Sequence, residues 1–337
     1  MALKTPAFWY RANNTRSVPL AELALTPLSW LYDSGRKLKK VGITPQKVKI
    51  PVLCLGNIVS GGSGKTPAVQ SIRKILITAA LTKNPFILSR GYGGNLSGPL
   101  KVDPSNHSSA NVGDEPLLLA AEGPVIVSRD RPAGARLAEK LGADLILMDD
   151  GFQNPSLKKD ISFLVMDGQS ALGNGKLLPA GPLREPLDEA LERTDAVILI
   201  GDDKESMQKR IPSCIPVFLA EIQPRSSLDS HADYFAFAGI GRPEKFKNTL
   251  ESQHIKIAGF KSFADHHPYT HKDIEILLRE AKEKNAKLVT TEKDRMRIPV
   301  SLRDKIDVLP IELKWNNPER LVEFLQTSLK NYTGEQG

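Results

Sequence analysis

Between Val48 and Ile222 the chain repeats one order of local patterns: a short apolar run, a polar turn and an amphipathic stretch with helical periodicity. The apolar runs are KIPVLCLG, PFILSR, PVIVSR, DLILMDD, SFLVMD, DAVILIG and PVFLAEI. Short β-branched strands that alternate with helices predict a mostly parallel, doubly wound α/β sheet, covered on both faces. Because such sheets bind ligands at the carboxyl ends of their strands, the polar residues that follow these runs are the first candidates for a site.

The pattern restarts at about residue 230 and predicts a second, smaller α/β unit. Its segments are DYFAFAGIGRP, IKIAGFKSFADHH, a helix near 271–284, AKLVTTEKD, IDVLPIEL and a closing helix at 317–331. The 337 residues are long enough for two cores. We therefore expect an N-terminal segment over 1–40, a large domain over 41–225 and a smaller domain over 226–337, with the last helix able to pack back on the large domain.

The first of these strands runs into LGNIVSGGSGKTP, which ends like a phosphate-binding loop but begins differently. The usual pattern G-x-x-x-x-G-K-[ST] needs a glycine where this chain has Val59. The glycines that remain still allow the backbone to approach an anion at a helix N-terminus, and the bend could come from a glycine pair within the loop. The sequence thus predicts an ATP-binding loop made of Val59, Ser60, Gly61, Gly62, Ser63, Gly64, Lys65 and Thr66. The alternative is a glycine-rich turn without a ligand.

Lys65 is the residue expected to reach the β- and γ-phosphates, and the Thr66 hydroxyl is expected to bind Mg²⁺. A phosphoryl-transfer site also needs an acid for the metal at the end of a neighbouring strand. DLILMDDGFQ supplies Asp149 and Asp150, and the residues alone do not decide between the two.

If the phosphoryl group goes to a hydroxyl, the site should also hold a base. NVGDEP offers Asp114 and Glu115, although Asp114 could instead cap the helix that follows it. FADHHPY offers Asp265, His266 and His267 in the second unit. A histidine beside a carboxylate can hold it and tune its pKa, so an Asp–His pair is a plausible base that forms only when the two units meet.

The N-terminal segment carries the basic charge of the chain. Residues 1–50 contain nine Lys and Arg against Glu22 and Asp33, and the rest of the chain is balanced. Next to these charges lies the apolar run LALTPLSWLY, which is too short to span a bilayer and resembles an interfacial anchor. The alternative is a core-packing helix with a solvated basic tail. Nucleic acid is a less favoured partner, because no aromatic residues alternate with the basic ones.

The two cysteines, Cys54 and Cys214, have neither the C-x-x-C spacing nor the histidine neighbours of a metal site. We expect them to be ordinary residues of a protein in a reducing compartment.

Together these motifs resemble the tetraacyldisaccharide 4′-kinase (lipid A 4′-kinase) family over nearly the whole chain. The resemblance rests on GGSGKTP, SRGYGG, VGDEP, SRDR, DDGFQ, PAGPLREP, FADHH and TTEKD, in that order. It implies a P-loop kinase that is peripheral to the cytoplasmic face of the inner membrane. Such an enzyme uses Mg-ATP to phosphorylate the 4′-hydroxyl of a lipid A disaccharide 1-phosphate precursor, and no obligate protein partner is evident.

The family's residue roles carry over to matching positions of this chain. The resemblance implies that Asp114 and His266 form the base dyad, and that Thr66 with Asp149 or Asp150, together with Glu115, holds the metal. It further implies that the N-terminal segment and the RGYGG loop meet the lipid. The residues expected around the sugar and its phosphate are Arg90, Tyr92, Arg129, Arg131, Arg184 and Glu185.

Two other functions compete with a lipid kinase. A P-loop ATPase of the partitioning or transport type would carry K-G-G-x-G-K-T, but Ser60 stands in place of its first lysine. A nucleotide-regulated membrane scaffold would need neither Asp114 nor the Asp265–His266 pair.

Overall fold

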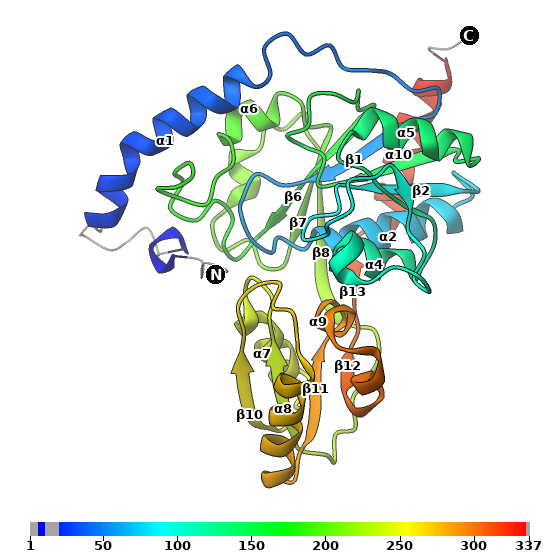
Figure 1. Cartoon of the computed structure of the whole chain (residues 1–337). Coiled ribbons are helices and arrows are strands. Elements are labelled where there is room, and N and C mark those ends of the chain that lie inside the picture. The colour runs from blue at the N-terminus through cyan, green and yellow to red at the C-terminus, as the bar shows by residue number, and fades with distance from the viewer. Residues whose placement is uncertain (1–5, 11–19, 335–337) are drawn as a thin grey trace.

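The computed structural model describes residues 6–10 and 20–334, which form two α/β units with a long N-terminal helix at the side of the larger one (Figure 1). The strands of the large sheet are β1 (Val52–Gly56), β2 (Pro85–Ser89), β3 (Leu100–Lys101), β4 (Val125–Val127), β5 (Leu145–Asp149), β6 (Ile161–Asp167), β7 (Ala196–Ile200), β8 (Val217–Pro224) and β13 (Ile311–Trp315). The strands of the small sheet are β9 (Tyr234–Ala238), β10 (Ile257–Ser262), β11 (Lys287–Thr291) and β12 (Asp307–Leu309).

Helices connect most of these strands. Those of the large unit are α1 (Leu20–Leu38), α2 (Lys65–Thr78), α3 (Ser109–Val112), α4 (Asp114–Ala120), α5 (Arg131–Lys140), α6 (Leu187–Leu191) and α10 (Pro318–Gly334), with the 3₁₀ turns η1 (Ala7–Tyr10) and η2 (Met207–Arg210). Those of the small unit are α7 (Pro243–Ser252), α8 (His271–Glu283) and α9 (Glu292–Arg297), with η3 (Val300–Lys305).

The large sheet has the strand order β13-β8-β7-β6-β1-β5-β2-β4-β3. Its pairings are parallel except at the two edges, where β3 and β13 run antiparallel to their neighbours. Alternate residues of the central strand β1 pack on opposite faces: Leu53 and Leu55 share a core with α2, and Cys54 shares one with α5. The prediction of a doubly wound, mostly parallel sheet of the P-loop type is confirmed. Cys54 is buried and Cys214 exposed, and both are free thiols.

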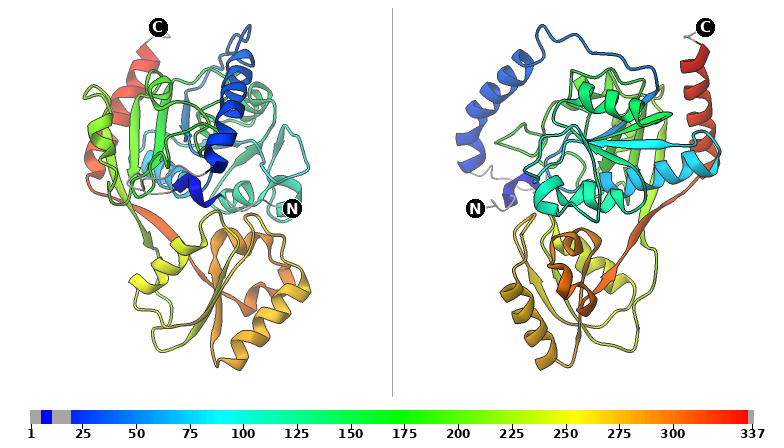
Figure 2. Two further views of the ribbon diagram at one scale, coloured as in Figure 1. Left: turned by 90° about the vertical axis from the view of Figure 1, so that its left-hand side faces the viewer. Right: turned by 45° about the vertical axis from the view of Figure 1, so that its right-hand side comes forward.

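The small sheet is parallel, with the order β10-β9-β11-β12, and it also has helices on both faces. Phe237 of β9 packs with α8 through Leu277, whereas Ala236 packs with α7 through Leu250. Figure 2 shows this unit below the large one, so that α9 and the ends of its strands face the large unit.

The C-terminal part of the chain returns to the large sheet. We expected residues 226–337 to form the smaller domain, but β13 pairs with β8 from Ile311↔Pro224 to Trp315↔Ala220. The helix α10 then buries Leu321 and Leu325 in the core beneath α2. The strand pattern IDVLPIEL therefore divides between the two units at Pro310. We propose that the smaller unit spans about 225–310 and is joined to the large one by two strands.

Leu321→Ala tests this return. The side chain is fully buried, so its truncation is expected to lower the free energy of unfolding by about 2–5 kcal/mol, measured by urea denaturation of the whole chain. The control is Gln326→Ala on the exposed side of the same helix, which should change it by less than about 0.5 kcal/mol. Equal denaturation midpoints for the two variants would mean that α10 does not pack on the large sheet.

The N-terminal segment 1–40 is described in part. Lys4, Arg11 and Arg16 of the basic cluster lie outside the described residues. Within the part that the structure describes, no helix is both long and apolar enough to cross a bilayer.

Candidate active site

The phosphate loop leaves the carboxyl end of β1 as extended backbone. Val59 is buried and forms an antiparallel bridge with Leu183. The N–H of Ser60 donates to the Pro182 carbonyl at 2.7 Å, and the Ile58 carbonyl accepts from the N–H of Arg184, also at 2.7 Å. The stretch 174–184, here called the clamp segment, therefore holds the entrance of the loop. Because a bridged strand needs no left-handed residue, this pairing explains why the chain can carry valine at position 59.

The free part of the loop begins at Gly61. Gly61 and Gly64 have φ values of 116° and 84°, which other residues rarely adopt. A Cβ at Gly64 would also lie 2.6 Å from Ile200. A Cβ at Gly62 would meet no atom within 4 Å, so the space beside this residue is open. Since glycine has no side chain to fill it, the space in front of the N-terminus of α2 stays free. This is the shape that an anion held by backbone N–H groups requires.

Lys65 opens α2 and lies beside the second of the adjacent acids. Its Nζ is 3.5 Å from Oδ1 of Asp150, and Arg184 Nη1 is 2.9 Å from the same oxygen. Burial would raise the pKa of Asp150, but Lys65 and Arg184 outweigh it and lower the pKa to about 2. Asp150 is therefore ionised and holds two cations at the phosphate loop.

Asp149 points to a different set of neighbours. Ser89 Oγ donates to its Oδ2 at 3.3 Å, and Thr66 Oγ1 lies 3.4 Å from Oε1 of Glu115 close by. Burial, with the like charges of Glu115 and Asp150, raises the pKa of Asp149 to about 7. Glu115 itself forms an ion pair with Lys293 of the small unit.

The carboxylate and hydroxyl oxygens of Asp149, Glu115 and Thr66 are of the kind that Mg²⁺ prefers as ligands. Among the described residues no three acids, histidines or cysteines converge closely enough to hold a metal ion by themselves. Mg²⁺ at phosphoryl-transfer sites is usually held by one or two carboxylates plus phosphate oxygens and water, so a complete protein cage is not required. The repulsion that raises the pKa of Asp149 is the kind that a divalent cation relieves.

The expected Asp–His pair forms between the two units. His266 Nδ1 lies 3.0 Å from Asp114 Oδ2, and Arg297 Nε lies 3.2 Å from the same oxygen. Burial opposes ionisation of Asp114, yet His266 and the cations around it lower its pKa to about 2. The hydrogen bond to Asp114 in turn raises the pKa of His266. Asp114 also accepts the N–H of Glu115 at 2.9 Å, so it makes a local helix-start contact as well.

The expected sugar-binding residues lie in different environments, and Arg184 is the one already described beside Asp150. Arg90, Arg129 and Tyr92 are exposed near the ends of β2 and β4, and the Tyr92 ring lies 5.4 Å from the ring of His266. Arg131 is buried and donates to the Ser128 carbonyl at 2.9 Å.

Glu185 is placed differently from our expectation. It is fully buried, it accepts from Gln153 Nε2 at 2.9 Å and it forms ion pairs with Arg193 and Arg36. A fully buried carboxylate with these partners is not open to a sugar, so we correct its expected role and propose that it holds α1 on the large unit through Arg36.

Sequence reasoning missed several charged residues at the place where the two units meet. Lys293 and Arg297 follow β11 and reach Glu115 and Asp114. Arg242 follows β9 and donates to Asp167 Oδ2 at 2.8 Å. The signals were present in TTEKD and in GIGRP, but no spacing rule links these motifs to Glu115, Asp114 and Asp167, which are far away in the sequence.

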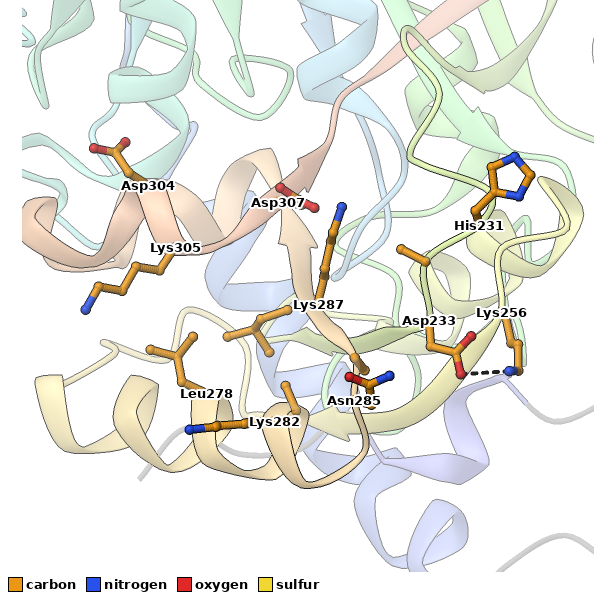
Figure 3. Close-up of a pocket in the computed structure, with 14 residues that line it drawn as sticks. His231, Asp233, Lys256, Leu278, Lys282, Asn285, Lys287, Asp304, Lys305 and Asp307 are labelled. Carbon is orange, nitrogen blue, oxygen red and sulfur yellow. Dashed lines mark ion pairs between the residues drawn. The ribbon is translucent and has the colours of Figure 1, made fainter.

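A wide hollow of about 760 Å³ lies away from these residues (Figure 3). Lys256, Lys282, Lys287 and Lys305 line it, and Lys256 pairs with Asp233 at 2.7 Å. It opens at the amino ends of β9, β11 and β12, whereas α/β sheets bind ligands at the carboxyl ends. None of the expected site residues lines this hollow.

Comparison with known proteins shows which family the chain is similar to. The family model described as tetraacyldisaccharide-1-P 4′-kinase matches residues 21–330. The tetraacyldisaccharide 4′-kinase of Rhodospirillum centenum is 43% identical over 326 residues, covering 96% of each chain. That of Parvibaculum lavamentivorans is 46% identical over 307 residues, covering 89% of each. The crystal structure of LpxK from Aquifex aeolicus in complex with ATP superposes with a TM-score of 0.75 at 29% identity, covering 92% of this chain and all of that one.

Proposed function

Because the chain belongs to the tetraacyldisaccharide-1-phosphate 4′-kinase family, we propose how its residues divide the work of that kinase. The reaction transfers the γ-phosphoryl group of ATP to the 4′-hydroxyl of a tetraacylated glucosamine disaccharide 1-phosphate and gives lipid IVA in lipid A biosynthesis. Nothing in the comparisons supports the rival ATPase or scaffold. The proposal depends on one observation: the Asp114–His266 pair forms beside Glu115, which lies 3.4 Å from Thr66 of the phosphate loop.

The loop residues 61–66 receive the phosphates of ATP. Backbone N–H groups at the N-terminus of α2 face the anion, and Lys65 contributes the charge that offsets the β- and γ-phosphates. Val59 and Ser60 fix the entrance, because the Ser60 N–H is already donated to Pro182.

Thr66, Glu115 and Asp149 are the residues that would hold Mg²⁺. When bound there, the cation neutralises charge on the phosphate oxygens. Asp150 is the less suited of the two adjacent acids, since Lys65 and Arg184 occupy its carboxylate.

Asp114 accepts the proton of the sugar hydroxyl, and His266 holds Asp114 in place. The low pKa of Asp114 does not prevent this role, because the aspartate of protein kinases likewise orients a hydroxyl and accepts its proton during phosphoryl transfer. Arg297 and Lys293 keep the carboxylate ionised before the hydroxyl arrives.

The exposed guanidinium groups of Arg90 and Arg129 bind the phosphorylated disaccharide, since their planar fork matches phosphate oxygens. Tyr92 covers the sugar from the side of His266. Arg131 and Arg184 do not contact the sugar directly but hold the two adjacent acids: Arg131 donates to the Asp149 carbonyl, and Arg184 pairs with the Asp150 carboxylate.

The helix α1 attaches the protein to a membrane surface. Its polar side faces the protein, where Glu22 and Ser29 are buried and Arg36 is paired. Its outer side presents Leu20, Leu23, Leu28, Trp30, Leu31 and Leu38, which are 50–84% exposed. A helix whose apolar face points outward suits insertion into a lipid interface, and the exposed Lys37 and Lys39 favour an anionic one. ATP is a cytoplasmic nucleotide, so we place this surface on the cytoplasmic face of the inner membrane.

The double variant Trp30→Ser, Leu31→Ser tests the membrane contact. Both side chains are 69% exposed, so the fold should tolerate the change, while binding to anionic vesicles should fall by at least about 10-fold in a flotation assay. Val300→Ser is the matched control, because Val300 is 75% exposed on the small unit. Unchanged flotation of the double variant would contradict the assignment of α1.

ADP release by the purified chain, with and without the disaccharide 1-phosphate lipid, tests the assignment as a kinase. We expect release that depends on the lipid and a product phosphorylated at the 4′-position. Release that ignores the lipid would favour the ATPase.

A further inference from the structure

The 3₁₀ turn η1 lies against the clamp segment. The carbonyl of Trp9 accepts from the N–H of Asn174 at 2.7 Å, and Trp9 Nε1 donates to the Pro179 carbonyl at 3.1 Å. The clamp segment also pairs with the entrance of the phosphate loop through Pro182 and Ser60. The described start of the chain is therefore built onto the same support as the ATP site.

Tyr10, the last residue of η1, reaches the loop itself. Its hydroxyl donates to the Ser60 carbonyl at 2.8 Å, and a Cβ on Gly61 would lie 3.3 Å from the same hydroxyl. The carbonyl of Ser60 and the N–H of Gly61 belong to one planar peptide unit. Holding the carbonyl therefore fixes the direction of the first N–H in the free part of the loop.

The aromatic ring of Tyr10 also contacts the small unit. The guanidinium carbon of Arg242 lies 4.5 Å from the ring centroid, and Arg242 Nη1 is 2.8 Å from Asp167 Oδ2 at the end of β6. A Cβ at the preceding Gly241 would lie 3.5 Å from the N atom of Gly62. Burial raises the pKa of Tyr10, so the hydroxyl keeps its proton and remains a donor. Tyr10 thus lies where the phosphate loop and the small unit meet.

We propose that Tyr10 is a positioning residue of the ATP site, which orients the Ser60–Gly61 peptide toward the phosphates and serves nucleotide binding rather than membrane binding. This rests on the proposed role of the loop in binding ATP. It also gives the N-terminal segment two separable tasks: α1 meets the lipid, and η1 supports the loop whose first glycine is replaced by Val59.

Tyr10→Phe removes one hydroxyl and keeps the ring beside Arg242. We expect the KM for ATP to rise by roughly 3- to 10-fold, the effect of one hydrogen bond, with kcat at saturating ATP changed by less than about 2-fold. Tyr234→Phe is the matched control, because that hydroxyl accepts only the Asp229 N–H at the far end of the small sheet and should leave the KM for ATP unchanged. An unchanged KM in Tyr10→Phe, or an equal rise in Tyr234→Phe, would overturn the proposal.

The two tasks are distinguished by a second pair of measurements. Tyr10→Phe should float with anionic vesicles as the unaltered chain does, whereas Trp30→Ser, Leu31→Ser should lose flotation and keep its Kd for ATP. Reduced flotation of Tyr10→Phe without a change in ATP binding would assign η1 to the membrane and overturn the proposal. The Kd of Lys65→Ala for ATP distinguishes failure of the Tyr10 proposal from failure of the loop assignment. If Tyr10→Phe and Lys65→Ala both bind ATP normally, the loop does not bind ATP. If only Tyr10→Phe binds ATP normally, the loop assignment stands and the proposal for Tyr10 fails.

Discussion

Lys65→Ala is expected to reduce kcat by at least about 10³-fold, because it removes the one loop side chain that carries charge to the transferred phosphoryl group. The amine lies at the first residue of α2, 3.5 Å from Asp150, so it is already directed toward the carboxyl edge of the sheet. The measurement is ADP release at saturating lipid, followed over a wide range of ATP concentration. A loss in kcat as well as in ATP affinity would show that the charge acts in the transition state.

Lys74→Ala is the control for this variant. Lys74 lies on the same helix, its side chain is 73% exposed and its partner Glu312 is 3.8 Å away, so kcat should not change. The stability of Lys65→Ala should remain near that of the unaltered chain, since Asp150 keeps its ion pair with Arg184. If the kcat of Lys65→Ala is close to that of the unaltered chain, the phosphate loop does not take part in the reaction.

The sequence was sufficient to predict those elements whose structure depends only on neighbouring residues. The strand that becomes β1, the loop glycines and the proline at the start of α2 each act over a few residues, so their structure followed from the sequence. The strand ends also predicted which residues come together, because parallel strands bring their carboxyl ends to one edge: Lys65 and Asp150 lie 3.5 Å apart there although they are far apart in the chain.

Pairing over long distances was not predictable in the same way. The strand β13 has the composition of any short strand, and only the free edge of β8 selects it for the large sheet. The same holds for Val59: a valine gives no sign that Leu183 will pair with it and replace the bend of the missing glycine. The family resemblance implied that Glu185 contacts the sugar, but its partners Arg36 and Arg193 come from two other helical regions.

The contact between the two units was predicted in part from the sequence. FADHH and VGDEP were recognised as halves of one pair, and the structure joins them at 3.0 Å. Arg297, which contacts Asp114, and Lys293, which pairs with the neighbouring Glu115, were not assigned, because charged residues after a strand are usually solvated. The proposed base therefore lies in an interface that depends on both units, and this gives the second large prediction.

Asp114→Ala is expected to lower kcat by roughly 10²–10⁴-fold, the range for loss of a general base. The KM for ATP should change little, since Asp114 contacts His266 and Arg297 and not the loop. His266→Ala should cost less, because it removes the residue that holds Asp114 and leaves the carboxylate with Arg297. The double variant should be no slower than Asp114→Ala alone if the two act as one unit.

The truncation also removes the buried carboxylate that contacts Arg297, although Arg297 keeps its ion pair with Asp294 and Lys293 keeps its pair with Glu115. Loss of stability therefore has to be separated from loss of the base. Asp114→Asn keeps the shape and should lose kcat nearly as strongly, because an amide cannot accept the proton. Asp195→Ala is a control far from the site: its carboxylate accepts the Ser162 N–H at 2.7 Å at the amino end of β6, so its loss should lower stability without lowering kcat. If Asp114→Asn turns over at the rate of the unaltered chain, Asp114 serves only as the helix-start residue that accepts the N–H of Glu115, and the proton of the sugar hydroxyl leaves by another route.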